Sequence, residues 1–427
     1  MPPHIVLLGT CDTKLPELLY LRCRILTHSP SARITLIDVG RTPSSDPAVT
    51  IPQSQLLEYQ PSSPTRLDAD ALQNLPRGEL LDKISKLATA CLLDLLSEDP
   101  IHGVVAAGGS GNTSVAAAVM QACPVGLPKL LVSTVASGDV GPIVGESDIC
   151  LMYSVVDVAG LNSVLRSVLD NAAGAIAGMA AAYKVREEEK AKEEGEKKIQ
   201  VGITMFGVTT PCVDVARKRL EENGCEVYVF HATGHGGRAM ERLVDEGALD
   251  AVLDVTTTEI CDHLFGGNMS AGPDRLLAAA ERGIPYIVSL GACDMVNFGP
   301  RDTVPEKFKD RNLLVHNSMV TLMRTSEEEC KQVGAWIGER LKESAKVPSM
   351  VQVWMPLHGV SVLDVEGAPF HDPKADEALW RSLGRKMEGS EIIADDWPMN
   401  INDERFATKI ADRLLQLILT HEGSLCS

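Results

Sequence analysis

The most constraining feature of this sequence is a repeated alternation of short apolar runs with longer helical patterns. Before residue 184, apolar runs such as HIVLLG and GVVAAG end in small or polar residues and are followed by helical segments. After residue 198 the same rhythm restarts with QVGITMFG and AVLDVTTT. Buried strands that alternate with helices are typical of a doubly wound parallel sheet. We therefore predict an α/β fold with two Rossmann-like subdomains whose sheets are largely parallel.

A charged segment divides the chain into two halves. The stretch KVREEEKAKEEGEKK, residues 184–198, is almost wholly charged and cannot belong to a core. It is either the solvated end of the preceding helix or a flexible linker. We predict an N-terminal α/β subdomain over residues 1–184, a charged linker over 185–198 and a C-terminal α/β subdomain over 199–427. Ligands of open α/β sheets bind at the carboxyl ends of the strands, so we expect a ligand cleft there.

Charge and hydropathy narrow the classes of partner. The formal net charge is -18, which disfavours general binding to nucleic acids or anionic membranes. No stretch reaches the roughly 18 apolar residues of a membrane span. The N-terminus has no basic region of the kind that begins a secretory signal. Eleven cysteines without a CxxC pair fit reduced thiols. We expect a cytoplasmic protein with no membrane partner.

The Gly-rich stretch GVVAAGGSGNTS, residues 103–114, is the first candidate binding loop. Its glycines permit close backbone approach, and a helix expected to begin near Asn112 would direct free N–H groups at an anion. The loop lacks both the GK[ST] of a Walker A motif and the full GxGxxG spacing, so a nucleotide must be held differently. A tight turn without a ligand is the alternative. The candidate residues are Gly108, Gly109, Ser110, Gly111, Asn112 and Thr113.

Two further loops are expected at the same edge of the first sheet. In GTCDTK, Lys14 can neutralise phosphate and Asp12 can hold Mg²⁺ or a ribose hydroxyl, which makes Asp12 the candidate metal ligand. The alternative is that Asp12 or Thr13 caps the following helix. The stretch VSTVASGD supplies more hydroxyl donors at another strand end. The candidate residues of these two loops are Thr10, Asp12, Thr13, Lys14, Ser137 and Gly138.

The second half gathers candidate acids and bases. DVTTTEICDHLFGG and LGACDMVNFG contain Glu259, His263 and Asp294 after apolar runs. These residues could serve as a general acid, a general base or metal ligands in a cleft between the subdomains. FHATGHGG, residues 230–237, is a second plausible anion-binding turn. None of these stretches matches a metal or triad spacing, and a lone His at a strand end is commonly a structural group, so the catalytic residues stay open.

The motifs, taken in order, resemble those of the uncharacterised protein family 0261. The matching stretches are GTCDTK, GGSGNTS, PKLLVSTVASGD, GITMFGVTTPCV, TTTEICDHLFGG and GACDMVNFGP, which span nearly the whole chain. The family includes the ATP-binding N-terminal domain of a plant tobamovirus-resistance protein. The resemblance implies two α/β subdomains, a homodimer and ATP as ligand, and Mg²⁺ is expected with it. It matches residues 10–14 and 108–113 to the nucleotide site.

Three functions are compatible with these observations. The first is an intracellular ATP-binding protein, assisted by Mg²⁺. The second is a metabolic enzyme that acts on a small phosphorylated or carboxylated substrate in the interdomain cleft. The third is an interaction protein of an antiviral or stress response. The Gly-rich turn argues against the third as the sole function, because a scaffold needs no convergent donors at a helix start. Whether the chain is an enzyme stays open.

Overall fold

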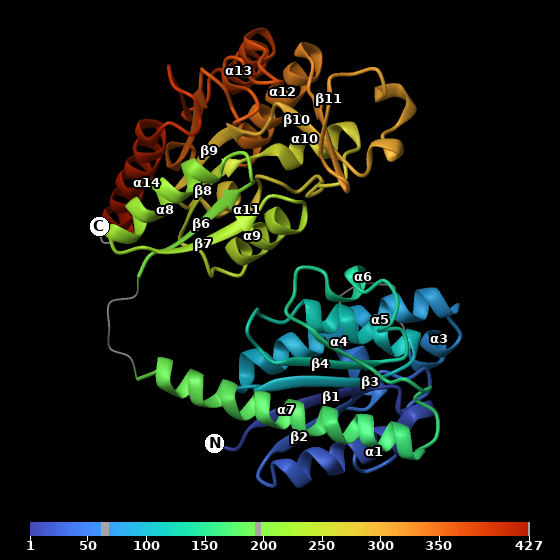
Figure 1. Ribbon diagram of the computed structural model, residues 1–427. Coiled ribbons are helices and arrows are strands. Elements are labelled where there is room, and N and C mark those ends of the chain that lie inside the picture. The colour runs from blue at the N-terminus through green and yellow to red at the C-terminus, as the bar shows by residue number, and fades with distance from the viewer. Residues whose placement is uncertain (61–67, 193–197, 426–427) are drawn as a thin grey trace. The chain divides into compact units, whose positions relative to one another are not determined.

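The computed structural model describes residues 1–60, 68–192 and 198–425 of the chain (Figure 1). The chain divides into two compact units, Met1–Gly195 and Glu196–Ser427. The boundary falls in the charged segment, of which residues 193–197 lie outside the described part. Helix α7 (Ser163–Lys190) includes the first residues of this segment and thus extends beyond residue 184. Among the described residues, no helix is long and apolar enough to cross a membrane.

The first unit is built on a five-stranded sheet with the order β2-β1-β3-β4-β5, in which every neighbouring pair is parallel. The strands are β1 (His4–Gly9), β2 (Arg33–Asp38), β3 (Gly103–Gly108), β4 (Lys129–Ser133) and β5 (Cys150–Tyr153). The other long helices are α1 (Cys11–His28), α4 (Arg77–Glu98) and α5 (Ser110–Gln121). The short helices are α2 (Gln53–Leu56), η1 (Leu57–Tyr59), α3 (Ala69–Gln73) and α6 (Gly141–Val144).

Helices cover both faces of this sheet, which is why its strands read as continuous apolar runs. Helices α1 and α7 lie on one face, and α4 and α5 lie on the other (Figure 1). Along β1, Ile5 and Leu7 pack toward the α1 and α7 side, whereas Val6 and Leu8 pack toward α4 and α5. The period of two in a strand thus divides one apolar run between two cores. Each crossing helix begins at the carboxyl edge of the sheet.

The second unit contains a six-stranded parallel sheet with the order β14-β13-β9-β8-β6-β7. Its strands are β6 (Gln200–Met205), β7 (Glu226–His231), β8 (Ala251–Thr256), β9 (Tyr286–Gly291), β13 (Val351–Pro356) and β14 (Ile393–Trp397). A small antiparallel sheet, which the sequence did not predict, has the order β10-β12-β11. Its strands are β10 (Met295–Phe298), β11 (Leu313–Asn317) and β12 (Val320–Arg324). The two parallel sheets confirm the predicted fold class.

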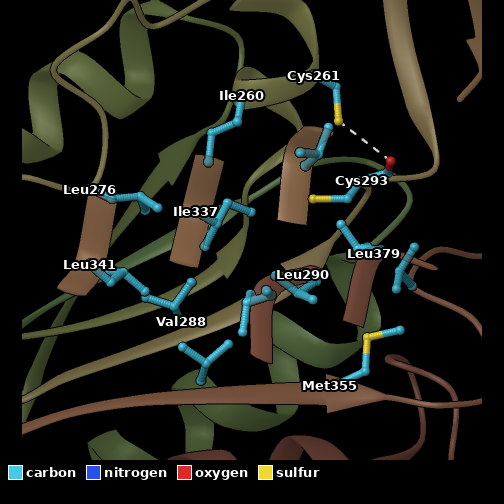
Figure 2. Close-up of a cluster of buried hydrophobic side chains, with 14 of the residues drawn as sticks. Ile260, Cys261, Leu276, Val288, Leu290, Cys293, Ile337, Leu341, Met355 and Leu379 are labelled. Atoms are coloured by element: carbon cyan, nitrogen blue, oxygen red, sulfur yellow. Dashed lines mark hydrogen bonds between the residues drawn. The ribbon is translucent and has the colours of Figure 1, made fainter. Parts of the chain in front are cut away.

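Helices again cover the parallel sheet of the second unit. They are α8 (Thr210–Glu222), α9 (His235–Asp245), α10 (Thr258–Phe265), α11 (Ala278–Arg282), α12 (Glu327–Ser344), α13 (Pro373–Met387) and α14 (Glu404–Leu425), with the short η2 (Arg301–Thr303), η3 (Glu306–Phe308) and η4 (Pro348–Met350). In the larger core, Val288 and Leu290 of β9 lie among side chains of α10, α12 and α13 (Figure 2). The Cys261 thiol donates to the Cys293 carbonyl at 3.4 Å. The ten cysteines of the described part are free thiols, as expected.

Candidate functional site

A cavity of about 690 Å³ opens at the carboxyl edge of the first sheet. We call it the N-terminal pocket. Loops that follow all five strands of this sheet contribute to its lining, together with one face of α4. The predicted residues that line it are Thr10, Asp12, Thr13, Lys14, Gly109, Ser110, Gly111 and Asn112. The structure therefore brings together the two loops that the sequence singled out separately, as the parallel sheet predicts.

The other predicted binding residues do not line the N-terminal pocket. Gly108 is the buried last residue of β3. The hydroxyl of Thr113 is buried and hydrogen-bonds to that of Ser133 at 2.7 Å, so it joins α5 to the end of β4. Ser137 and Gly138 are exposed in the turn after β4. Thr113 thus holds the first turn of α5 to the end of β4 without lining the cavity itself.

The first turn of α5 forms one wall of the pocket. The helix begins at Ser110, two residues earlier than expected, and its N-cap Gly109 has no side chain that could bond the first N–H groups. Such groups attract anions, and the helix dipole adds to the attraction. Asn112 is only 4% exposed, and its Nδ2 donates to the Ala107 carbonyl at 3.1 Å. Among the described residues, its Oδ1 has no hydrogen-bond partner.

Three cationic side chains line the same cavity: Lys14, Arg41 and Arg77. Arg41 donates through Nη1 to the carbonyls of Gln73 and Leu75, the latter at 3.1 Å, which fixes its guanidinium beside the start of α4. The Nη2 atom of Arg77 lies 3.1 Å from the position that a Cβ at Gly111 would take. The cation that the Gly-rich loop lacks in sequence is therefore provided by a different helix.

Sequence reasoning found Lys14 and missed both arginines. Arg41 stands in the Pro- and Ser-rich stretch RTPSSDPAV, which is only readable as an irregular insertion. Arg77 follows Pro76 at the first position of α4. Proline is favoured at helix starts, and the helix starts of this unit lie at the ligand edge, so Pro76 was a signal that could have pointed to Arg77.

Two carboxylates organise the loops around the pocket. Asp12 Oδ2 accepts from the backbone N–H groups of Arg41 at 2.9 Å and Thr42 at 3.2 Å. Asp38, at the end of β2, is fully buried. Its Oδ1 accepts from the N–H groups of Cys11 at 3.1 Å and Gly40 at 2.9 Å, and its Oδ2 accepts from the N–H of Ser44 at 2.9 Å. Asp38 therefore acts as a brace that holds the segments after β1 and β2 together.

The metal prediction rests on Asp12, which lines the pocket together with Asp157. In the part of the chain that the structure describes, no group of three or more His, Cys, Asp or Glu side chains is arranged to hold a metal ion. Mg²⁺ differs from most metals because it often takes one or two carboxylates and completes its shell with phosphate oxygens and water. Asp12 and Asp157 are carboxylates of the kind that this mode uses.

A strained turn forms the lip of the pocket. Val155 has a φ of 65° and is 60% exposed. The N–H of Val156 donates to the Ser154 carbonyl at 2.7 Å, which closes a three-residue turn around it. Positive φ is costly for a β-branched residue, and such strain persists mainly at functional sites. Glu17 of α1 accepts from the N–H of Gly160 at 2.6 Å and so ties the loop that follows β5 to α1.

The candidate acids of the second unit are buried. Glu259 has no exposed surface, and burial raises its pKa while Arg275 opposes the shift. Asp294 is also fully buried, and its Oδ2 accepts from the Ser361 hydroxyl at 2.8 Å. Burial raises the pKa of Asp294 to about 6. Neither carboxyl can reach a substrate while the unit keeps this packing.

The remaining predictions in the second unit also resolve into structural contacts. The ring of His263 is partly exposed and packs edge-on against Trp336, with ring centroids 6.0 Å apart. The predicted anion turn at residues 230–237 contains the N-terminus of α9, where Gly234 and Gly237 donate their N–H groups to Glu259 at 2.6 and 3.0 Å. An internal carboxylate therefore occupies this turn, in contrast to the first turn of α5.

Two family models match the chain. The N-terminal domain of an uncharacterised protein family (UPF0261) matches residues 3–185, and the C-terminal domain of the same family matches residues 198–418. A UPF0261 protein of Clostridium tetani is 43% identical over 98% of this chain and 100% of its own length. A UPF0261 protein of Rhizobium meliloti is 44% identical over 95% of this chain and 96% of its own.

A plant protein is also similar over nearly the whole chain. The ToMV resistance protein Tm-1(GCR237) of Solanum lycopersicum is 39% identical over 97% of this chain but only 56% of its own length. Among solved structures, a UDP-N-acetylglucosamine 2-epimerase from Rickettsia bellii covers 98% of this chain and 96% of its own, at 11% identity. Its TM-score of 0.21 is too low to carry any argument.

Proposed function

The chain belongs to the uncharacterised protein family UPF0261, and on that premise we propose that it is a nucleotide-binding protein whose ligand, ATP, occupies the N-terminal pocket. The observation that carries the proposal is the meeting of an uncapped helix start with three cationic side chains in one cavity. Family membership alone specifies no reaction, so the proposal is one of binding.

The phosphate end of the ligand would lie at the first turn of α5. Free N–H groups at a helix start bind phosphate oxygens, and the positive end of the helix dipole stabilises their charge. Lys14 and Arg77 line the same cavity and would add charge-assisted hydrogen bonds.

The remainder of the ligand would lie against an apolar wall. Leu80, Leu81 and Ile84 of α4 line one side of the pocket, and Val155 lines the strained lip. A cavity of about 690 Å³ lies within the range of small-molecule and cofactor sites, which are mostly apolar with a few placed polar groups. Asp12 or Asp157 would hold Mg²⁺, which would neutralise part of the phosphate charge.

The alternative functions have less support. A metabolic enzyme with its acid and base in the second unit requires accessible carboxyls, yet Glu259 and Asp294 are fully buried. The name of the tomato relative refers to virus resistance, and a role of this chain in a virus response rests on that likeness alone. The homodimer and the cytoplasmic location likewise remain proposals.

The test is a calorimetric titration of the full chain with ATP, ADP and AMP, with and without Mg²⁺. A ligand at about 100 times its Kd should stabilise the protein by roughly 2.7 kcal/mol, which thermal unfolding detects. Gly111→Val should abolish this stabilisation, because its side chain would fill the space between α5 and Arg77. Gly178→Val is the matched control, since a Cβ at exposed Gly178 meets nothing within 4 Å.

Lys14→Ala should weaken ATP binding, while Lys190→Ala on α7 should not. If no nucleotide shifts the unfolding of the wild-type chain, the nucleotide proposal is wrong. Phosphate release, followed in the same samples, separates an ATPase from a protein that only binds ATP.

A further inference from the structure

The cation nearest to the Gly-rich turn comes from α4. A Cβ built on Gly111 would lie 3.1 Å from Arg77 Nη2 and 3.7 Å from Leu81 Cδ2. The first turn of α4 therefore lies directly against the first turn of α5. Both helices begin without a side-chain cap, at Pro76 for α4 and at Gly109 for α5. Two helix starts and one guanidinium thus converge on the same part of the cavity.

Arg77 differs from the other arginine of the pocket. Arg41 is held by the carbonyls of Gln73 and Leu75, so part of its guanidinium is already engaged. Arg77 is exposed, and within the described part of the chain it forms no ion pair. A guanidinium presents a planar fork of donors that matches two phosphate oxygens at once. Arg77 is therefore the cation of the pocket that is free to bind a ligand through both arms.

The full set of charges in the pocket fits a chain of phosphates better than a single phosphate. Three cations and the α5 helix start provide separate positions for phosphate oxygens, while Asp12 and Asp157 provide carboxylates for a divalent cation. With the outer phosphates of ATP seated on the α5 turn beside Arg77, the single phosphate of AMP, which lies next to the ribose, would not reach this turn and would leave the carboxylates unused. A diphosphate or triphosphate with Mg²⁺ would engage both kinds of group.

On the premise of the proposed nucleotide site, we infer that Arg77 is the residue that selects polyphosphates. It binds the outer phosphates of a nucleoside di- or triphosphate and replaces, from a neighbouring helix, the lysine that the Gly-rich loop lacks. The inference deepens the proposed function by naming the residue that makes the pocket prefer ATP and ADP to AMP. Gly111 is needed for this role of Arg77, because any larger residue at position 111 would displace the Arg77 guanidinium.

The test compares ATP, ADP, AMP and inorganic tripolyphosphate by calorimetric titration of the full chain in the presence of Mg²⁺. Arg77→Gln should weaken ATP and tripolyphosphate binding by about tenfold or more, the value of one or two hydrogen bonds to a charged group, and should change AMP binding by less than about threefold. Arg77→Lys should recover part of the loss, since it keeps the charge without the fork. The matched control is Arg166→Gln, because Arg166 is an exposed residue of α7 that does not line the pocket. This variant should bind the four compounds as the wild type does.

The outcomes separate the two ideas. An equal loss for ATP and AMP in Arg77→Gln, or no loss, overturns the selection by Arg77 and leaves the nucleotide site intact. A wild-type chain that binds tripolyphosphate but no nucleotide overturns the proposed function and leaves the phosphate selection by Arg77 standing. A wild-type chain that binds none of the four compounds overturns both.

Discussion

The Nε atom of Arg275 lies 2.8 Å from Oε2 of Glu259, and both side chains are buried in the second unit. The same carboxylate accepts hydrogen bonds from Gly234 and Gly237 at the start of α9. Glu259 of α10 thus fills the N-terminus of α9 while it forms an ion pair with Arg275, which precedes α11. The Gly-containing start of α9 is therefore not an open anion site, because the Glu259 carboxylate already accepts from its N–H groups.

We predict that Glu259→Gln destabilises the second unit without affecting ATP binding. The amide keeps the size of the side chain but loses the charge that Arg275 and the two N–H groups require, at a cost of about 2 kcal/mol. All four tryptophans lie between residues 336 and 397, so their fluorescence in urea reports the unfolding of this unit alone. Exposed Glu281→Gln is the control. Unchanged stability would show that the ion pair is unimportant.

The second prediction concerns pH. Asp294 has a pKa raised to about 6 by burial, near Asp364 and Asp376, whose pKa values burial raises to about 6 and about 7. A carboxyl in an unfolded chain ionises near pH 3.9, so between about pH 4 and 7 the folded unit holds protons that the unfolded chain has lost. The stability of the second unit should therefore fall as pH rises through this window and level off above it.

Asp294→Asn removes the titrating carboxyl and should reduce the stability difference between pH 5 and pH 8 by about 1.4 kcal/mol, because a pKa of about 6 lies one unit above pH 5. Urea unfolding at the two pH values, followed by tryptophan fluorescence, measures it. Asp395→Asn on exposed β14 is the control. A pH profile identical to that of the wild type would contradict the assignment of the slope to this cluster.

The third prediction concerns the strained lip. Val155→Gly should raise the stability of the first unit by about 1 kcal/mol, because relief of positive φ in a β-branched residue exceeds the entropy that glycine adds to the unfolded chain. Scanning calorimetry measures the shift. Val135→Gly, at another exposed loop valine of ordinary φ, should instead destabilise. A loss of stability in both variants would mean that the turn is not strained.

The fourth prediction concerns the brace under the pocket. Asp38→Asn places an amide among three backbone donors and should cost about 2–3 kcal/mol in the first unit. Faster hydrogen exchange in peptides that cover β1 and β2 would locate the effect, and ATP should no longer stabilise the variant. Asp46→Asn weakens a single hydrogen bond, the one from the N–H of Ala48, and should have a smaller effect. Equal exchange in the two variants would argue against the brace.

Much of the fold could be predicted from the sequence because its signals are local. The run HIVLLG becomes β1 and GVVAAG becomes β3, each followed directly by a helix, and both larger sheets are parallel as predicted. The start of α5 was placed two residues too late, because Ser110 and Gly111 read as loop residues. The antiparallel pairing of β10, β12 and β11 was not predicted, because an apolar run such as LLVHN indicates a strand but does not specify its partner or direction.

The sequence by itself determined the strand-to-helix turns at residues 9–14 and 108–113, because glycine and apolar periodicity act on the nearest few residues. Only the tertiary structure decided which side chains from distant segments join them. Arg77 reaches Gly111 across 34 positions because α4 and α5 pack side by side, and the side chain of Glu259 fills the turn at Gly234 from 25 positions further along the chain. A periodic pattern specifies the buried face of each element, but not the neighbour that the face will meet, and that neighbour decides whether a helix start stays open to a ligand.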